Sequence, residues 1–170
     1  VGWILRATAD NPFVLPEFIQ PALAAAAAAD ADYCSIEGAP LGTTVELVRR
    51  EALLRLEQMA VASDEREHAT LGLLRRPGQF RITRWQVPAA YHLPDLRLTV
   101  DTPDDYRWVA SLLPEELTAP ATLAWTALRE SASRHPRTQH PEQHLAPTIQ
   151  SLKESAWTAL PDLSPSPVSP

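Results

Sequence analysis

The sequence predicts an α/β fold in which helices flank a mostly parallel sheet, followed by a helical and disordered C-terminal extension. Strand-like and helix-like patterns alternate over residues 1–113, as connections between parallel strands require. Hydrophobic residues make up 45% of the 170 residues and charged residues 21%, which is typical of a globular domain. The prolines are unevenly spread, since 8 of the 17 lie in residues 1–113 and 9 in the shorter remainder.

The first 113 residues contain the expected strands and helices in alternation. Pro16 and Glu17 are typical of a helix start, but Pro21 would clash with a preceding turn, so a start at Pro21 is the alternative. Thr102, Pro103 and Asp105 suit the N-cap, N1 and N3 positions of a helix. The predicted strands are residues 1–8, 32–36, 43–48, 80–87 and 96–100, and the predicted helices are residues 16–29, 49–62, 64–75 and 102–113.

Three regions follow from this organisation. Residues 1–113 form one α/β unit, and residues 114–150 form a helical extension with a helix expected at 116–133. Residues 151–170 comprise the end of a helix at 149–159 and a tail rich in proline and serine. This tail has too little apolar surface to offset the entropy of ordering, so we expect it to be disordered.

Composition and charge argue against several classes of partner. The net charge of −6 and the pI near 5.3 give no basic excess for nucleic acid. No run of about 18 apolar residues is present, so no membrane span is expected.

A single cysteine excludes an internal disulfide, and no signal peptide is visible, so we expect a cytoplasmic protein. The chain opens at Val1 in a strand-like pattern, which predicts a missing start.

Two aspartates stand out because each follows a predicted strand. Asp10 lies in the segment at 6–12, and Asp101 lies directly before the helix capped by Thr102. Ligands of open α/β sheets bind beyond the carboxyl ends of the strands, so both carboxylates would point into one crevice. Two adjacent carboxylates need a compensating cation, and Mg²⁺ accepts such a pair together with water and phosphate oxygens. The alternative is that both are ordinary turn or cap residues.

Five short segments stand out when their order along the chain is considered together. They are Arg-Ala-Thr-Ala-Asp-Asn-Pro at 6–12, Ala-Asp-Tyr at 31–33, Pro-Leu-Gly-Thr-Thr-Val-Glu at 40–46, Glu-Arg-Glu-His-Ala-Thr at 65–70 and Leu-Arg-Leu-Thr-Val-Asp-Thr-Pro-Asp-Asp at 96–105. In this order they resemble the cytidylyltransferases that activate acidic sugars, in particular the spore-coat-polysaccharide and acylneuraminate cytidylyltransferase-like group. The resemblance covers residues 3–136 and includes a weaker C-terminal match at Trp125, Leu128, His135 and Pro136.

The resemblance implies a partial Rossmann-like nucleotide-diphospho-sugar transferase fold and a reaction. A hydroxyl of an acidic sugar would attack the α-phosphate of CTP, transfer CMP to the sugar and release pyrophosphate. Asp10 and Asp101 would hold the Mg²⁺ cofactor. The substrate side would contain Arg6, Glu46, Arg66, Glu67 and His68, with Arg6 or Arg66 pairing with the sugar carboxylate.

Simpler interpretations exist for three of these residues. Glu46 is alternatively an exposed strand residue, His68 a helix-end residue and Arg66 a solvated partner of neighbouring acids. A homodimer is a further expectation.

The chain also departs from the family pattern. None of its glycines forms the basic, glycine-containing phosphate loop with which the family opens, and the only lysine is Lys153. The chain therefore resembles the C-terminal portion of the enzyme, which predicts a truncated chain and leaves its activity open. One alternative is a non-catalytic remnant that serves as an oligomerisation or interaction module. Another is an unrelated acidic α/β domain.

Overall fold

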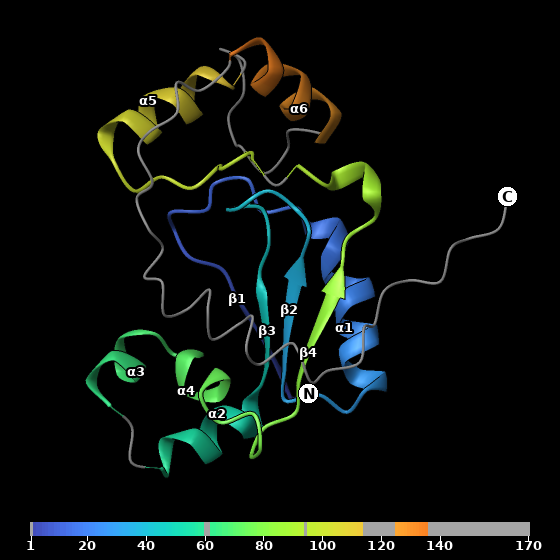
Figure 1. Ribbon diagram of the computed structural model, residues 1–170, viewed down its shortest axis with the longest axis vertical. Helices are drawn as coiled ribbons and strands as arrows, with labels where there is room; N and C mark the ends of the chain where they lie inside the picture. Colours follow the sequence, from blue (N-terminus) through green and yellow to red (C-terminus); the bar gives the residue numbers. More distant parts are fainter. Residues whose placement is uncertain (1, 60–61, 94, 114–124, 136–170) are drawn as a thin grey trace, which may run out of the picture.

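The protein is built around a four-stranded sheet in the order β1-β3-β2-β4 (Figure 1). The computed structural model describes residues 2–59, 62–93, 95–113 and 125–135. The strands are β1 (Trp3–Arg6), β2 (Tyr33–Glu37), β3 (Glu46–Arg49) and β4 (Ile82–Gln86).

Strand directions confirm the predicted α/β class, with a sheet that is largely but not wholly parallel. Strands β2 and β4 pair in parallel, whereas β3 pairs antiparallel with both β2 and β1. Three of the four described strands therefore run the same way and β3 runs against them. The cause is the connection at 38–45, which turns at Gly38 and Gly42, both with positive φ, and is too short for a parallel crossover.

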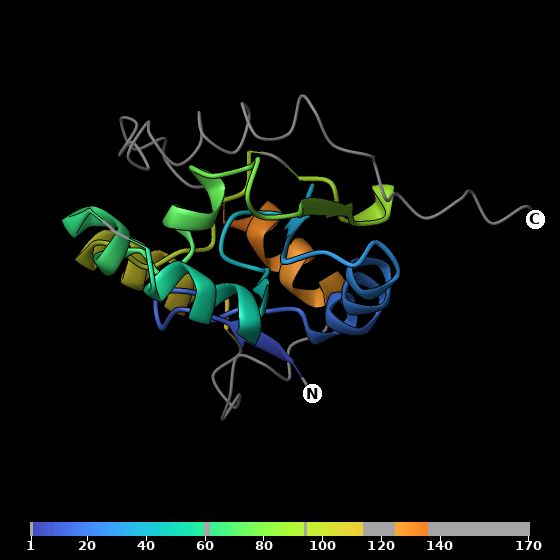
Figure 2. The same ribbon diagram turned by 90° about the horizontal axis from the view of Figure 1, so that it is seen from below.

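The helices lie on both faces of the sheet and at one end of it (Figures 1 and 2). In chain order they are η1 (Pro16–Phe18), α1 (Ile19–Ala28), α2 (Arg50–Glu57), α3 (Ser63–Glu67), α4 (Leu71–Leu74), η2 (Ala89–Tyr91), α5 (Pro103–Ser111) and α6 (Trp125–Arg134). The part of the expected helix at 116–133 that precedes 125, the expected helix at 149–159 and the expected tail all lie outside the described residues.

The prediction that Pro21 disturbs the helix is wrong. A short 3-10 turn at η1 leads directly into α1, which places Pro21 as the third residue of the α-helix. The first four N–H groups of a helix have no intrahelical acceptor, so a proline there breaks no hydrogen bond. The helix therefore begins at Ile19, before the proline.

Two other predicted elements are corrected. The helix expected at 64–75 is two short helices, because the backbone of His68 (φ −109°, ψ 89°) leaves the helical region between α3 and α4. The strand expected at 96–100 is an extended segment with a single bridge from Arg97 to Leu41. Its main-chain amides donate hydrogen bonds to two different loops. The amide of Leu98 donates to the carbonyl oxygen of Leu41, and that of Val100 donates to the carbonyl oxygen of Asp10.

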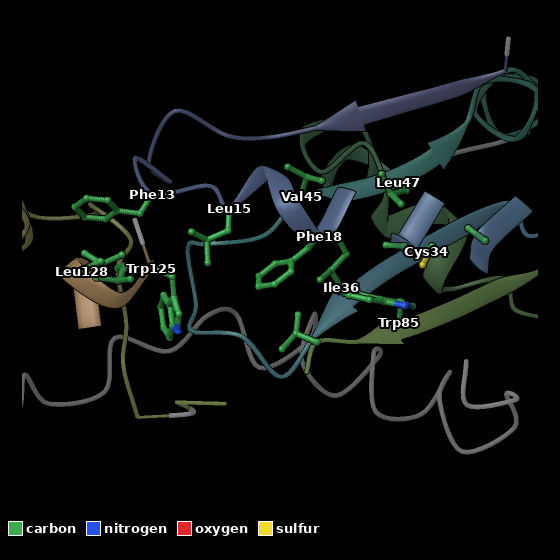
Figure 3. Packing of buried hydrophobic residues seen from close by; sticks show 14 of the residues in the cluster. Phe13, Leu15, Phe18, Cys34, Ile36, Val45, Leu47, Trp85, Trp125 and Leu128 are labelled. Atoms are coloured by element: carbon green, nitrogen blue, oxygen red, sulfur yellow. The ribbon is translucent and has the colours of Figure 1, made fainter. Parts of the chain in front are cut away.

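Two apolar clusters cover opposite faces of the sheet. One face packs against α1 and contributes Cys34, Ile36, Leu47 and Trp85, which Figure 3 shows together with Phe18. The same cluster continues into α5 and α6 at the end of the sheet. The other face packs against α2 and α4 and contributes Tyr33, Val48 and Ile82. Residues that alternate along each strand thus enter different cores. No described helix is long and apolar enough to cross a membrane.

Candidate functional site

A row of polar side chains crosses the sheet on the face that packs against α2 and α4. Arg6 of β1 lies opposite Glu46 of β3, which lies opposite Ser35 of β2, which in turn lies opposite Arg84 of β4. Residues that lie opposite one another on paired strands point to the same face of the sheet. Residues two positions apart on one strand also share a face, so Ser35 and Arg84 lie on the same face as Tyr33 and Ile82. Apolar packing at one end of this face therefore gives way to a polar row toward the carboxyl ends of β1, β2 and β4.

Glu46 is the centre of this row and is bonded by three different donors. Its carboxylate lies 2.6 Å from Nη1 of Arg6, 2.7 Å from the hydroxyl oxygen of Tyr33, and 3.1 Å from Oγ1 of Thr70. Glu46 is consequently a partly buried, firmly oriented acceptor rather than a solvated strand residue. The charge of Arg6 is already balanced by this carboxylate, which weakens the expectation that Arg6 receives a sugar carboxylate.

The hydroxyl of Tyr33 depends on the same carboxylate. Tyr33 is fully buried, and burial raises its pKa well above 10, with the negative charge of Glu46 raising it further. The phenol therefore stays protonated and donates its hydrogen to Glu46. Tyr33 and Thr70 are two contacts of this site that sequence reasoning missed, although Tyr33 belongs to one of the recognised segments.

The residues predicted at 66–68 lie at the end of α3, beside this cluster in the chain. The side chains of Arg66 and Glu67 are exposed and His68 is half-buried. Among the described residues, none of the three contributes a hydrogen bond or ion pair from its side chain. The contact with Glu46 comes instead from Thr70, two residues beyond His68.

The corner between α3 and α4 is held by ion pairs. Glu65 is buried and accepts bonds from Arg76 at 2.8 and 3.1 Å and from the Ala62 amide at 3.1 Å. Asp64 pairs with Arg75 at 2.6 Å. Hydrogen bonds from these arginines lower the pKa of both carboxyls. This network fixes the turn that presents Thr70 to Glu46.

Asp10 and Asp101 lie on adjacent segments at the end of the sheet reached by β1. The amide nitrogen of Val100 lies 2.8 Å from the carbonyl oxygen of Asp10, which joins the two segments. The carboxylate of Asp101 pairs with Arg97, and the main-chain amide of Asp101 bonds Asp105 at 3.0 Å. Asp10 has no side-chain hydrogen bond or ion pair with any described residue.

The donor chemistry around these aspartates suits a hard cation. Oδ1 of Asn11 and Oγ1 of Thr99 are buried oxygens without hydrogen-bond partners, and each adjoins a segment that carries one of the aspartates. Within the described residues, no group of three or more His, Cys, Asp or Glu side chains gathers as a complete metal cage. Mg²⁺ does not need one, since it binds one or two carboxylates and completes its shell with water and phosphate oxygens.

In sequence and in fold, the chain resembles the cytidylyltransferases, as its motif order predicts. It is 34% identical over 110 residues to the spore coat polysaccharide biosynthesis protein SpsF of Bacillus subtilis, a match that covers 64% of this chain and 46% of that protein. It is 29% identical over 104 residues to an uncharacterised protein of Methanocaldococcus jannaschii, covering 61% of this chain and 43% of that one. No protein-family model matches.

A cytidylyltransferase from Leptospira borgpetersenii has a similar structure. The TM-score is 0.67 at 18% sequence identity, and the match covers 83% of this chain and 62% of the other. At that identity the likeness establishes the fold. The chain spans about half the length of the curated relatives it matches.

Proposed function

We propose that this chain forms the metal-binding and acceptor-binding part of a nucleotidyltransferase that transfers CMP from CTP to an acidic sugar. The observation that carries the proposal is the hydrogen bond from Val100 to the carbonyl of Asp10. It joins the two aspartate-bearing segments at the carboxyl end of β1, where ligands of α/β sheets bind. The resemblance to cytidylyltransferases supports the same assignment.

In the proposed reaction, the oxygen of a sugar hydroxyl forms a bond to the α-phosphorus of CTP. The bond from that phosphorus to the bridging oxygen breaks, pyrophosphate leaves with the electron pair, and the hydroxyl proton passes to water. Asp10 and Asp101 would hold Mg²⁺, which when bound neutralises charge on the phosphate oxygens. Asp101 would exchange its pairing with Arg97 for the cation.

Glu46 would accept hydrogen bonds from hydroxyls of the acceptor sugar. Its orientation is fixed by Arg6, Tyr33 and Thr70, so the carboxylate is aligned before the sugar binds. Arg66, Glu67 and His68 would contact the substrate from the exposed end of α3.

The test combines metal binding with turnover. Mn²⁺ titration, followed by water-proton relaxation, would compare wild type with Asp10→Asn and Asp101→Asn, with Glu17→Gln on η1 as the control. Loss of a ligand should weaken the site about tenfold or more, whereas the control should bind as wild type does. Pyrophosphate release would then be measured with CTP, Mg²⁺ and a panel of sugar acids. Equal Mn²⁺ affinity in all four proteins would refute the metal assignment.

A second function is favoured by the edge of the sheet. β1 pairs only with β3 among the described strands, and it exposes Ile4 by 39% and Leu5 by 45%. Such an edge accepts a further strand, as an interaction module would require. Sedimentation of wild type and of Leu5→Lys tests this. An assembly that the lysine dissociates supports the module, and a monomer at all concentrations opposes self-association.

A further inference from the structure

Arg84 extends the polar row to the opposite edge of the described sheet. It lies on β4 opposite Ser35, which lies opposite Glu46, which lies opposite Arg6. Its neighbours along β4 confirm the direction of the side chain, because Ile82 joins the cluster under α2 and α4 while Trp85 joins the cluster on the other face. Arg84 is half-buried, so its guanidinium stays near the sheet surface.

Arg84 differs from the other polar groups in the row because its Nε has no hydrogen-bond partner among the described residues. Arg6 is neutralised by Glu46, and Ser35 donates its hydroxyl hydrogen to Glu37. Nε of Arg84 is buried and has no hydrogen-bond partner, and no carboxylate of the described residues lies within ion-pair distance. A buried guanidinium N–H without an acceptor is costly, and an oxyanion is the acceptor that its fork-shaped geometry fits.

We infer that Arg84 is the group that binds the carboxylate of the acceptor sugar, a role that rests on the proposed function. Sequence reasoning considered Arg6 and Arg66 for this role. Arg6 is already paired within the protein, and Arg66 lies on the exposed surface of α3. Arg84 has both a donor without an acceptor among the described residues and a fixed place in the row, where Ser35 separates it from Glu46.

Binding measurements with the full chain test this inference. D-glucuronate, D-glucose, inorganic phosphate and CTP with Mg²⁺ would each be titrated by calorimetry into wild type, Arg84→Gln, Arg84→Lys and Arg107→Gln. Arg107 is an exposed arginine on α5, and its removal controls for the loss of one positive charge. Arg84→Lys keeps the charge but not the two-pronged geometry, and it remains informative if Arg84→Gln folds poorly.

We expect Arg84→Gln to bind glucuronate about tenfold or more weakly than wild type and to bind glucose unchanged. Arg84→Lys should be intermediate, and Arg107→Gln should match wild type. Unchanged glucuronate affinity in both Arg84 variants would overturn the inference and leave the proposed function standing. Weakened binding of phosphate or CTP in place of glucuronate would reassign Arg84 to the nucleotide. A wild-type chain that binds no sugar would overturn the proposed function itself.

Discussion

The main-chain amide of Val100 donates a 2.8 Å hydrogen bond to the carbonyl oxygen of Asp10. This single bond ties the loop after β1 to the segment that leads into α5, although the two are far apart in the sequence. Thr102 and Asp105 then cap α5 reciprocally, and Asp105 also accepts the amide of Asp101. The backbone of both aspartates is therefore held in place without using their carboxylates, of which, within the described residues, only that of Asp101 is paired, with Arg97.

Removing Arg97 should strengthen cation binding at Asp101. Arg97 pairs with this carboxylate and would compete with a cation for it. We expect Arg97→Gln to raise Mn²⁺ affinity about two- to fivefold, since the pair is partly exposed and worth little. Arg107→Gln, which breaks the similar pair with Asp104, should have no effect. Weaker Mn²⁺ binding in Arg97→Gln would show that Arg97 organises the site rather than competing for it.

Tyr33→Phe should loosen Glu46 without disturbing the core, because the ring remains. The variant loses a buried hydrogen bond to a carboxylate, so its free energy of unfolding should fall by about 1–2 kcal/mol. Glucose affinity should fall with it if Glu46 binds sugar hydroxyls. Urea unfolding and calorimetry measure the two effects. Tyr106→Phe is the control, since Tyr106 is 65% exposed, and a Tyr33→Phe protein as stable as this control would contradict the prediction.

Gly42 should not tolerate a side chain. Its φ of 93° disfavours any L-residue, and a Cβ would lie 2.8 Å from the carbonyl carbon of Leu98 and from the nitrogen of Thr99. Gly42→Ala should therefore cost about 2 kcal/mol or more and displace the segment that leads to Asp101. Gly78→Ala is the matched control, since nothing lies within 4 Å of its Cβ position. Equal urea midpoints for the two variants would disprove this account.

The contribution of Glu65 to stability should disappear in acid. Hydrogen bonds from Arg76 lower its pKa in the folded state, so its carboxylate stabilises the protein at neutral pH, and this stabilisation is lost as pH falls through that lowered pKa. We expect Glu65→Gln to be less stable by about 1–2 kcal/mol at pH 7 and to approach wild type near pH 2. Urea unfolding at several pH values measures the difference. The exposed Glu57→Gln should show none, and a Glu65 deficit that is constant with pH would count against the ion pair.

Local signals alone were enough to predict α5. Thr102, Pro103 and Asp105 act within one turn, and the helix forms over Pro103–Ser111 with the expected cap. The order of strands and helices over residues 1–113 was likewise readable, apart from the expected helix at 64–75, which is two helices, and the segment at 96–100, because alternating burial is a property of each element. The segments that carry Asp10 and Asp101 were predicted to lie together for a general reason, namely the meeting of strand ends at one edge of a sheet.

The tertiary structure determines which charged side chains of the site are paired. Arg6 and Arg84 look equally available in the sequence, yet the register of β1 on β3 pairs one with Glu46, while the register of β4 on β2 leaves the other without an acceptor. The direction of β3 and the loss of a strand at 96–100 likewise depend on contacts with segments that are distant in the sequence. A single sequence shows hydrophobic periodicity and helix caps, but it does not show which residues pair across the sheet.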